Sequence, residues 1–293
     1  MKIKKALIAA AGFGTRFLPF TKTIQKEMIP VLNKPVVDYL VDDLVKAGIT
    51  EIVFVINEHN KQILHYFREN NRLKAYLEKM NKLHLYDEVK TLHEKATFHF
   101  VKQADSDPYG SATPIKIAQD HFKDEDSFVV LMGDDIPYNA DGISEVSLMI
   151  NHLEKTKAKA LATFVEQPET ELYRYGIAET FEKNGYQYLK NLIEKPTPGT
   201  APTNLANISK YILTPRVFEL IEKQEIDKKS GELYITDTVT MLAQEEAVAI
   251  YTPKGTYLDC GYPLGWLKAN LTMAKNNPEL RQELRKFIKE IDF

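Results

Sequence analysis

The first residues of this chain that could do chemistry form a glycine loop, Gly12-Phe-Gly14-Thr15-Arg16, with Lys26 ten residues beyond it. The first 26 residues hold six Lys or Arg and no Asp or Glu. Glycine lets backbone N–H groups approach an anion closely, and Arg and Lys add charge and donors that suit phosphate oxygens. The pattern favours a polyphosphate site, although a glycine turn after a strand also occurs for structural reasons alone.

Two acidic positions could add a metal ion to such a site. Gly133-Asp134-Asp135 closes an apolar run, and since neighbouring side chains point in opposite directions, one of these carboxylates can face a crevice. Asp259 again follows a strand-like run. Mg²⁺ between two carboxylates and a polyphosphate suits phosphoryl or nucleotidyl transfer. The alternative for both positions is turn chemistry at the end of a strand.

Three further positions could bind the rest of a nucleotide or a sugar. In Glu194-Lys195-Pro196 the carboxylate can accept sugar hydroxyls while the ammonium neutralises a phosphate. Gln103 has the donor and acceptor needed to read the edge of a base, and Tyr109-Gly110-Ser111 makes a tight turn beside it. Taken singly, each could equally be an exposed turn or an ordinary surface ion pair.

Elements that would position these residues alternate along the first half of the chain. Apolar runs of strand length lie at 6–11, 51–56, 98–101 and 128–132, and 36–47 has helical spacing, with Pro35 near its start and Gly48 past its end. This alternation predicts a mainly parallel sheet. Ligands of such sheets lie at the carboxyl ends of the strands, where the glycine loop falls.

The remaining segments differ in texture. Residues 60–96 contain no Gly or Pro and predict a helical excursion with a solvated surface, whose apolar face could dock on the sheet or on a second subunit. Strands at 160–166, 176–181 and 188–193 are expected to form a mixed or antiparallel addition to the sheet. Further strands are expected at 204–213 and 248–252, and helices at 215–224 and 234–246. After Pro263 the tail is expected to be helical in two pieces, broken near Asn277-Pro278.

Composition argues against several classes of protein. A net charge of -3 argues against non-specific binding to nucleic acid or membranes, and no apolar run approaches the roughly 20 residues that cross a bilayer. The only cysteine, Cys260, can form no disulfide within the chain, which favours the cytoplasm. The seven histidines show no paired spacing typical of a zinc site. The first residues could pass for a signal peptide, but their short apolar core ends at Gly12, which indicates a strand.

Neither of the two familiar phosphate loops is present. The dinucleotide fingerprint G-x-G-x-x-G matches at Gly12 and Gly14, but Phe17 stands at the position of the third glycine. The mononucleotide loop G-x-x-x-x-G-K-[ST] is absent. An oxidoreductase that uses NAD is therefore remote.

The chain resembles the bacterial sugar-1-phosphate nucleotidylyltransferases in its opening, Ala9-Ala-Ala-Gly12-Phe-Gly14-Thr15-Arg16-Phe-Leu-Pro19-Phe-Thr21, followed by Lys26-Glu27-Met28-Ile-Pro30 and Lys34-Pro35. The likeness continues in order through Tyr175-Gly176, Glu194-Lys195-Pro196, Tyr211-Ile-Leu-Thr-Pro215, Gly231-Glu232-Leu-Tyr-Ile-Thr236-Asp237 and Leu258-Asp259-Cys260-Gly261. It spans about residues 3–275. Lys-Glu-Met-x-Pro and the excursion at 60–96 point to the branch that uses UTP and glucose 1-phosphate.

The resemblance implies a Rossmann-like, three-layer nucleotidyltransferase fold (α/β), with a central mixed, mostly parallel sheet flanked by helices. Residues 1–275 would form a single domain with a β-rich, sugar-binding half at about 160–262, and 276–293 a C-terminal helical tail. The implied reaction joins UTP and glucose 1-phosphate into UDP-glucose and pyrophosphate. The implied enzyme is a cytoplasmic homodimer or homotetramer with small-molecule substrates and neither a nucleic-acid nor a membrane partner.

The resemblance also implies roles for matching residues. The implied catalytic residues are Arg16, Lys26, Asp134 and Lys195. The implied nucleotide-binding residues are Ala10, Ala11, Gly12, Gly14, Thr15, Gln103 and Gly110. Gly176, Glu194 and Lys195 would hold the sugar phosphate, and Asp134 and Asp259 would bind Mg²⁺.

The chain departs from the family pattern in two places. Gln25 replaces the usual proline before Lys-Glu-Met, and the segment 109–113 lacks the second Gly and the His of a Gly-x-Gly-His-Ala pattern. Because the second departure lies near the base and ribose, a same-fold enzyme that uses dTTP or another sugar 1-phosphate stays open. A nucleotide-sugar-binding regulator without turnover is the other alternative, although a pure binder has no need of two metal carboxylates.

Overall fold

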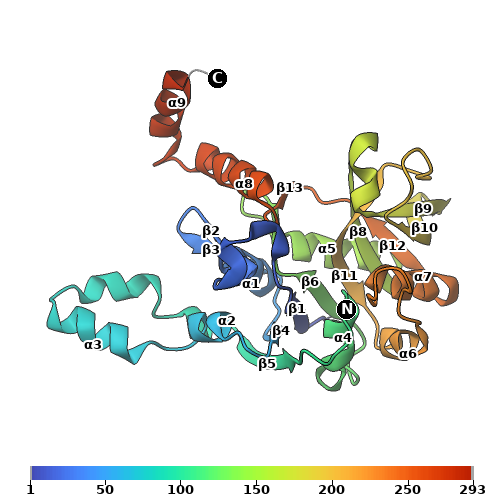
Figure 1. Ribbon diagram of the computed structural model, residues 1–293, viewed down its shortest axis with the longest axis horizontal. Coiled ribbons are helices and arrows are strands. Elements are labelled where there is room, and N and C mark those ends of the chain that lie inside the picture. The colour runs from blue at the N-terminus through green and yellow to red at the C-terminus, as the bar shows by residue number, and fades with distance from the viewer. Residues whose placement is uncertain (1, 292–293) are drawn as a thin grey trace.

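The computed structural model describes residues 2–291 and is centred on a nine-stranded mixed sheet (Figure 1). The strand order is β5-β4-β1-β6-β11-β8-β12-β10-β9, and β13-β7 and β2-β3 form two small sheets. The strands are β1 Lys5–Ala10, β2 Pro30–Val31, β3 Lys34–Pro35, β4 Glu51–Asn57, β5 Thr97–Gln103, β6 Phe128–Met132, β7 Asp135–Tyr138, β8 Ala160–Glu166, β9 Gly176–Lys183, β10 Tyr186–Glu194, β11 Leu205–Leu213, β12 Val248–Tyr251 and β13 Thr256–Asp259.

Helices connect these strands. The α-helices are α1 Val36–Lys46, α2 Gln62–Tyr66, α3 Asn71–Lys79, α4 Thr113–Ile117, α5 Glu145–Thr156, α6 Arg216–Lys223, α7 Ile235–Glu245, α8 Pro263–Asn276 and α9 Arg281–Glu290. Short 3-10 helices are η1 Thr15–Phe17, η2 Phe20–Lys22, η3 Lys26–Met28, η4 Leu83–Glu88, η5 Leu92–Glu94, η6 Gln119–His121 and η7 Glu169–Arg174. The strands and helices predicted outside 60–96 are confirmed, with ends shifted by one or two residues.

The sheet is parallel in one half and largely antiparallel in the other. β5, β4, β1 and β6 run parallel, as the first half of the sequence predicts. Beyond them β11 is antiparallel to β6 and β8, β12 is parallel to β8, and β10 is antiparallel to β12 and β9, so the sheet is mixed, as expected, and its antiparallel pairings lie in the second half. One cause is the tight hairpin between β9 and β10, where Asn184 and Gly185 both have positive φ and impose antiparallel pairing.

Both faces of the sheet are covered by helices. Along β1, Ala6 and Ile8 pack with α1 and α5 on one face, whereas Leu7 and Ala9 pack with α4, α6 and α7 on the other. Side chains alternate between the faces of a strand, so a strand that is covered on both sides is apolar throughout. This explains why β1 reads as an unbroken apolar run that leads directly into the glycine loop.

A third core brings the end of the chain back to the start. It joins α8 to β2, β7 and β13, and Trp266 Nε1 donates a hydrogen bond to the Pro30 carbonyl at 2.7 Å. Within this unit Asp259 of β13 lies opposite Asp135 of β7 in the antiparallel register. The two acidic motifs predicted from the sequence are therefore neighbours in the fold.

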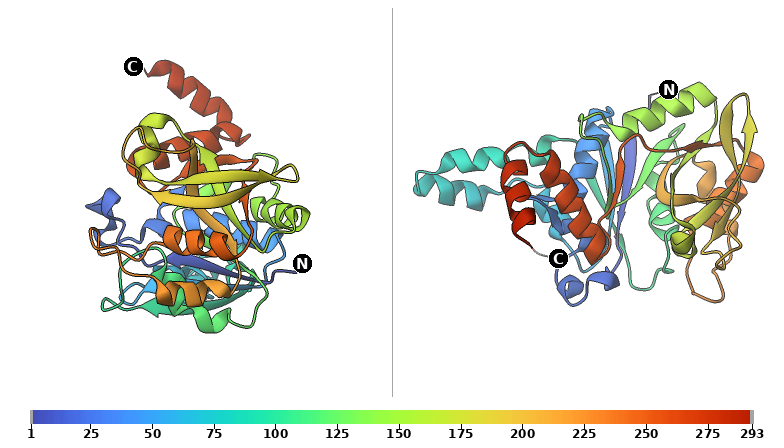
Figure 2. Two further views of the ribbon diagram at one scale, coloured as in Figure 1. Left: turned by 90° about the vertical axis from the view of Figure 1, so that its right-hand side faces the viewer. Right: turned by 90° about the horizontal axis from the view of Figure 1, so that it is seen from above.

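Residues 60–96 extend from the body as an arm, at the opposite end of the molecule from β9 and β10 (Figures 1 and 2). The arm is helical in short pieces. The apolar face predicted for 60–96 consists of Ile63, Leu64, Phe67, Leu73, Leu77 and Leu83. Ile63 and Phe67 are buried against the sheet, whereas Leu73 and Leu83 remain exposed. No helix in the described part of the chain is long and apolar enough to cross a membrane.

Candidate active site

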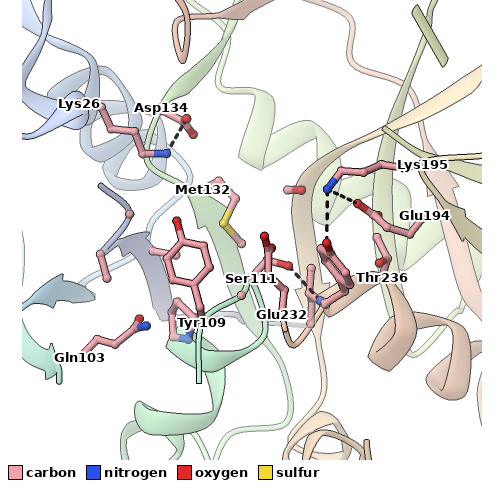
Figure 3. Close-up of a pocket in the computed structure, with 18 of the residues that line it drawn as sticks. Lys26, Gln103, Tyr109, Ser111, Met132, Asp134, Glu194, Lys195, Glu232 and Thr236 are labelled. Atoms are coloured by element: carbon pink, nitrogen blue, oxygen red, sulfur yellow. Dashed lines mark hydrogen bonds and ion pairs between the residues drawn. The ribbon is translucent and has the colours of Figure 1, made fainter. Parts of the chain in front are cut away.

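A cavity of about 390 Å³ lies where β1, β5 and β6 end, as predicted for the carboxyl edge of the parallel strands (Figure 3). The predicted residues that line it are Ala11, Gly12, Arg16, Lys26, Gln103, Gly110, Asp134, Glu194 and Lys195. Ala10, Gly14, Thr15, Gly176 and Asp259 do not line it. The structure thus brings residues from most of the chain's length to one cavity.

The predicted residues outside the cavity wall lie directly behind it or beside it. Ala10 is buried at the end of β1, and Thr15 is exposed at the start of η1. Gly14 has a φ of +65°, and its carbonyl accepts a hydrogen bond from the Thr21 hydroxyl at 2.7 Å. A Cβ on Gly14 would also lie 3.1 Å from Cβ of Lys26, so a glycine here lets the loop and the lysine segment pack closely.

Lys26 and Asp134 form the centre of one side of the cavity. Lys26 Nζ lies 2.6 Å from Oδ2 of Asp134 and 3.8 Å from Oε1 of Glu27, and the Arg16 guanidinium lies 3.7 Å from the same Asp134 oxygen. Burial alone would raise the pKa of Asp134, but Lys26 and then Arg16 outweigh it and hold that pKa below its ordinary value. Asp134 is therefore ionised at neutral pH. Its charge and that of Glu27 raise the pKa of Lys26 despite the burial of the ammonium.

Glu194 and Lys195 stand at the other side of the cavity (Figure 3). Lys195 Nζ lies 3.5 Å from Oε1 of Glu194, 3.5 Å from the Tyr234 hydroxyl and 4.9 Å from the centre of the Tyr234 ring. Burial raises the pKa of Glu194, with Lys195 opposing it. A Cβ on Gly176 would lie 3.1 Å from Oε2 of Glu194, so this glycine leaves room for the carboxylate. The pair offers an acceptor and a half-exposed cation next to each other.

Gln103 lies at the end of β5, beside a backbone strap formed by residues 109–112. Its side chain is buried, and Oε1 has no hydrogen-bond partner in the described part of the chain. Gly110 in the strap has a φ of +132°, and a Cβ there would lie 2.3 Å from the Leu233 backbone nitrogen. Leaving a buried amide oxygen unpaired costs free energy, so a ligand with a donor would be favoured at this end of the cavity.

Asp134, Asp259 and Arg16 border a small gap beside Gly261. A Cβ on Gly261 would lie 2.6 Å from Oδ2 of Asp134, 2.8 Å from Nη2 of Arg16 and 3.1 Å from Oδ1 of Asp259, so the missing side chain of this glycine lets the two carboxylates and the guanidinium face one space. Burial and then the charge of Asp134 raise the pKa of Asp259, and the Gly261 backbone N–H opposes this by donating to Oδ1 at 2.9 Å. Two clustered carboxylates are the donor set that Mg²⁺ prefers.

Glu232, Tyr234 and Ser209 are among the residues that line the cavity but received no role from the sequence. Glu232 and Tyr234 belong to the motif Gly231–Asp237, which is part of the family resemblance, but no role was inferred for them. Ser209 lies in the irregularity of β11 between Asn207 and Tyr211 and has a φ of +52°. Serine is not among the residues enriched at positive φ, so Ser209 could be found only from the structure.

Comparisons with known proteins agree with this geometry. The sequence model of the nucleotidyl transferase family matches residues 5–276. A UTP--glucose-1-phosphate uridylyltransferase of Staphylococcus epidermidis is 36% identical over 99% of both chains, and that of Bacillus subtilis is 36% identical over 98% of this chain and 96% of its own.

Solved structures give the same result. A UTP-bound UGPase from Acinetobacter baumannii matches 99% of this chain and 100% of its own with a TM-score of 0.87 and 31% identity. A UDP-glucose pyrophosphorylase complexed with UDP-glucose matches 94% of this chain and 100% of its own with a TM-score of 0.81 and 31% identity. The family resemblance is confirmed: this chain belongs to the nucleotidyl transferase family and has its α/β fold, with helices around a mixed sheet.

Proposed function

We propose that this protein is an enzyme that transfers the uridylyl group of UTP to glucose 1-phosphate, giving UDP-glucose and pyrophosphate. The observation that carries the proposal is the placement of two cation–carboxylate pairs, Lys26–Asp134 and Lys195–Glu194, around one cavity. Two phosphorylated substrates could therefore bind with their phosphates facing each other. The relatives named as UTP–glucose-1-phosphate uridylyltransferases, and the related structures bound to UTP and to UDP-glucose, support the choice of substrates.

The site residues then divide between the two substrates. The loop from Ala10 to Thr15 would hold the nucleotide with its backbone, with Ala11, Gly12 and Gly14 close to the phosphates. Arg16 and Lys26 would neutralise the triphosphate, and Gln103 and Gly110 would contact the base and ribose. Gly176, Glu194 and Lys195 would hold glucose 1-phosphate, with the carboxylate on its hydroxyls and the ammonium on its phosphate.

The chemistry needs no covalent intermediate. A phosphate oxygen of glucose 1-phosphate attacks the α-phosphorus of UTP, forming a P–O bond, while the bond from that phosphorus to the bridging oxygen breaks and pyrophosphate leaves. Positioning and neutralisation of charge by Arg16, Lys26 and Lys195 do most of the work.

We propose that Asp134 and Asp259 hold Mg²⁺ in the gap beside Gly261. Bound there, the ion would neutralise phosphate charge and withdraw electron density from the phosphorus. The position of this gap next to Lys26 supports the assignment, because Oδ2 of Asp134 both faces the gap and contacts Lys26, so the ion and the lysine would act on neighbouring phosphate oxygens.

The domain division, location and assembly are proposed on separate grounds. Residues 1–275 would be one Rossmann-like, three-layer domain, supported by helices on both faces of the sheet and by the family match over 5–276, and 276–293 would be a tail. The single cysteine supports the cytoplasm. A homodimer or homotetramer is supported by α9, which buries none of its described residues and exposes Phe287 and Ile288. Light scattering measures the number of subunits.

The test is pyrophosphate release across UTP, dTTP, CTP, ATP and GTP, each with glucose, galactose, N-acetylglucosamine and mannose 1-phosphates, with and without EDTA. A dominant signal for UTP with glucose 1-phosphate that EDTA abolishes supports the proposal. A maximum with dTTP or another sugar keeps the mechanism and replaces the substrate. If the folded protein releases no pyrophosphate with any of these pairs, the result favours a regulator that binds nucleotide sugars without turnover.

Asp134→Ala supplies the matched variant for this assay. We expect it to lose at least about 100-fold in turnover, because it removes a proposed metal ligand and the partner of Lys26. Asp141→Ala is the control, since Asp141 is an exposed acid paired with Lys254. Full Mg²⁺-dependent turnover by folded Asp134→Ala would contradict the metal assignment.

A further inference from the structure

Two exposed aromatic rings meet at the edge of the cavity. Phe13 and Tyr109 are 60% and 49% exposed, their ring centres lie 6.4 Å apart, and their planes differ by 22°. Phe13 belongs to the glycine loop after β1, and Tyr109 belongs to the strap after β5 and lines the cavity. Exposed apolar side chains that gather at a cavity are typical of a binding surface.

The loop that carries each ring is held in place by its own contacts. The Tyr109 carbonyl accepts a hydrogen bond from the Leu233 N–H at 2.8 Å, and the Leu233 carbonyl accepts one from the Ala112 N–H at 2.9 Å. Next to Phe13, the Gly14 carbonyl accepts a hydrogen bond from the Thr21 hydroxyl. The rings are therefore presented by ordered backbone, so little conformational entropy would be lost when a ligand covers them.

The position of the rings within the site points to one part of the substrate. Figure 3 shows Tyr109 and Gln103 on the same side of the cavity, away from Glu194 and Lys195. Gln103 offers a buried, unpaired amide oxygen there. An amide can read the edge of a planar base, and an aromatic ring can cover its face.

We propose that Phe13 and Tyr109 bind the nucleobase of the nucleotide substrate by stacking, while Gln103 selects its edge. This inference rests on the proposed function. It assigns a use to Tyr109, which stands in the segment 109–113 where the chain departs from the family pattern. Every base has an aromatic face, so stacking contributes affinity and leaves the choice of base to the hydrogen bonds.

The experiment compares Phe13→Ala, Tyr109→Ala and Tyr109→Phe with the wild-type protein. Alanine at either ring should raise the KM for UTP by about 5- to 150-fold, the range that loss of base stacking produces, and leave the KM for glucose 1-phosphate within about twofold. Tyr109→Phe keeps the ring and should stay within about threefold of wild type for UTP. Tyr173→Ala is the control, because Tyr173 is similarly exposed (51%) and does not line the cavity.

Calorimetry with uridine as the probe separates stacking from a general loosening of the site. Uridine carries no phosphate, so stacking predicts that the alanine variants lose the same factor in affinity for uridine as for UTP. Unchanged UTP binding, or equal losses for both substrates, would overturn the proposal. So would alanine variants that bind UTP normally but change molecular mass in light scattering, because the rings would then form a protein interface. Wild-type turnover in the same assay reports separately on the proposed function.

Discussion

Replacing Glu27 with glutamine should stabilise the folded protein at pH 8 and have little effect near pH 4. Glu27 is completely buried in η3, and neither carboxylate oxygen has a hydrogen-bond partner in the described part of the chain. The nearest cation is Lys26, with Nζ 3.8 Å from Oε1. Burial raises the pKa of Glu27 from its ordinary 4.5 to about 7, because the attraction of Lys26 offsets only part of the cost of desolvation.

The size of the effect follows from this pKa. A carboxyl group whose pKa is higher in the folded state than in the unfolded chain binds its proton more tightly in the folded state. The free energy of unfolding therefore falls as the pH rises from about 4.5 to about 7, and it stays constant above about pH 7. At about 1.4 kcal/mol per pH unit, the ionised Glu27 lowers the free energy of unfolding by about 3 kcal/mol at pH 8. Glutamine fills nearly the same volume without this titration. Its amide and the protonated acid both lack partners, so the two proteins should be similar at low pH.

Urea unfolding of both proteins at several values from pH 4 to pH 8, in buffer without added divalent metal, measures the difference. The stability of Glu27→Gln relative to wild type should rise with pH and level off above pH 7. Glu182→Gln, at an exposed position on β9, is the control and should show a small difference throughout. A difference that stays constant with pH, or a Glu27→Gln protein that is less stable than wild type at pH 8, would refute the reasoning.

Two further substitutions test the packing behind the site. Gly110→Ala should cost at least about 2 kcal/mol of stability, because the added Cβ would lie 2.3 Å from the backbone nitrogen of Leu233. Gly185→Ala is the control: Gly185 also has a positive φ, but a Cβ there would meet nothing within 4 Å, so this change should cost about 1 kcal/mol. Equal losses in thermal or urea unfolding would show that the contact is unimportant. Lys210→Met should cost about 3–5 kcal/mol, because it leaves the buried carboxylate of Asp135 without its cation. Adding Asp135→Leu to Lys210→Met should recover most of that loss. A Lys210→Met protein as stable as wild type would contradict the importance of the Lys210–Asp135 ion pair.

The sequence predicted best what is local along the chain. The run that becomes β1, the glycine loop after it and the helix α1 each depend on neighbouring residues, and each lies within one residue of its predicted place. The same holds for Asp134, which follows β6 and was therefore expected at the carboxyl edge of the sheet. Lys26 begins η3 and does not follow a strand of the sheet, and its contact with Asp134 at 2.6 Å, which spans 108 residues, was found only from the structure.

What depends on pairing between distant segments could not be predicted in the same way. The second half could be predicted only as a mixed or antiparallel addition, because a strand-like run shows no direction and does not reveal which strand it pairs with. The Asn184-Gly185 turn between two predicted strands was the available signal for a hairpin, and it was not used. The neighbourhood of Asp259 and Asp134 likewise depends on the pairing of β13 with β7 and on the packing of α8.

Under the proposed function, the charged residues of the site would stabilise the fold and bind substrate through the same atoms. Lys26 with Asp134 and Lys195 with Glu194 each place a carboxylate against a cation, and a buried charge without such a partner would cost several kcal/mol. Phosphate oxygens can replace the carboxylate as the partner of each lysine, which leaves Asp134 available to a divalent cation and Glu194 to sugar hydroxyls. Folding stability and substrate binding are therefore coupled through these pairs, so a variant at Lys26 has to be compared with wild type in unfolding as well as in turnover before a loss of activity is assigned to catalysis.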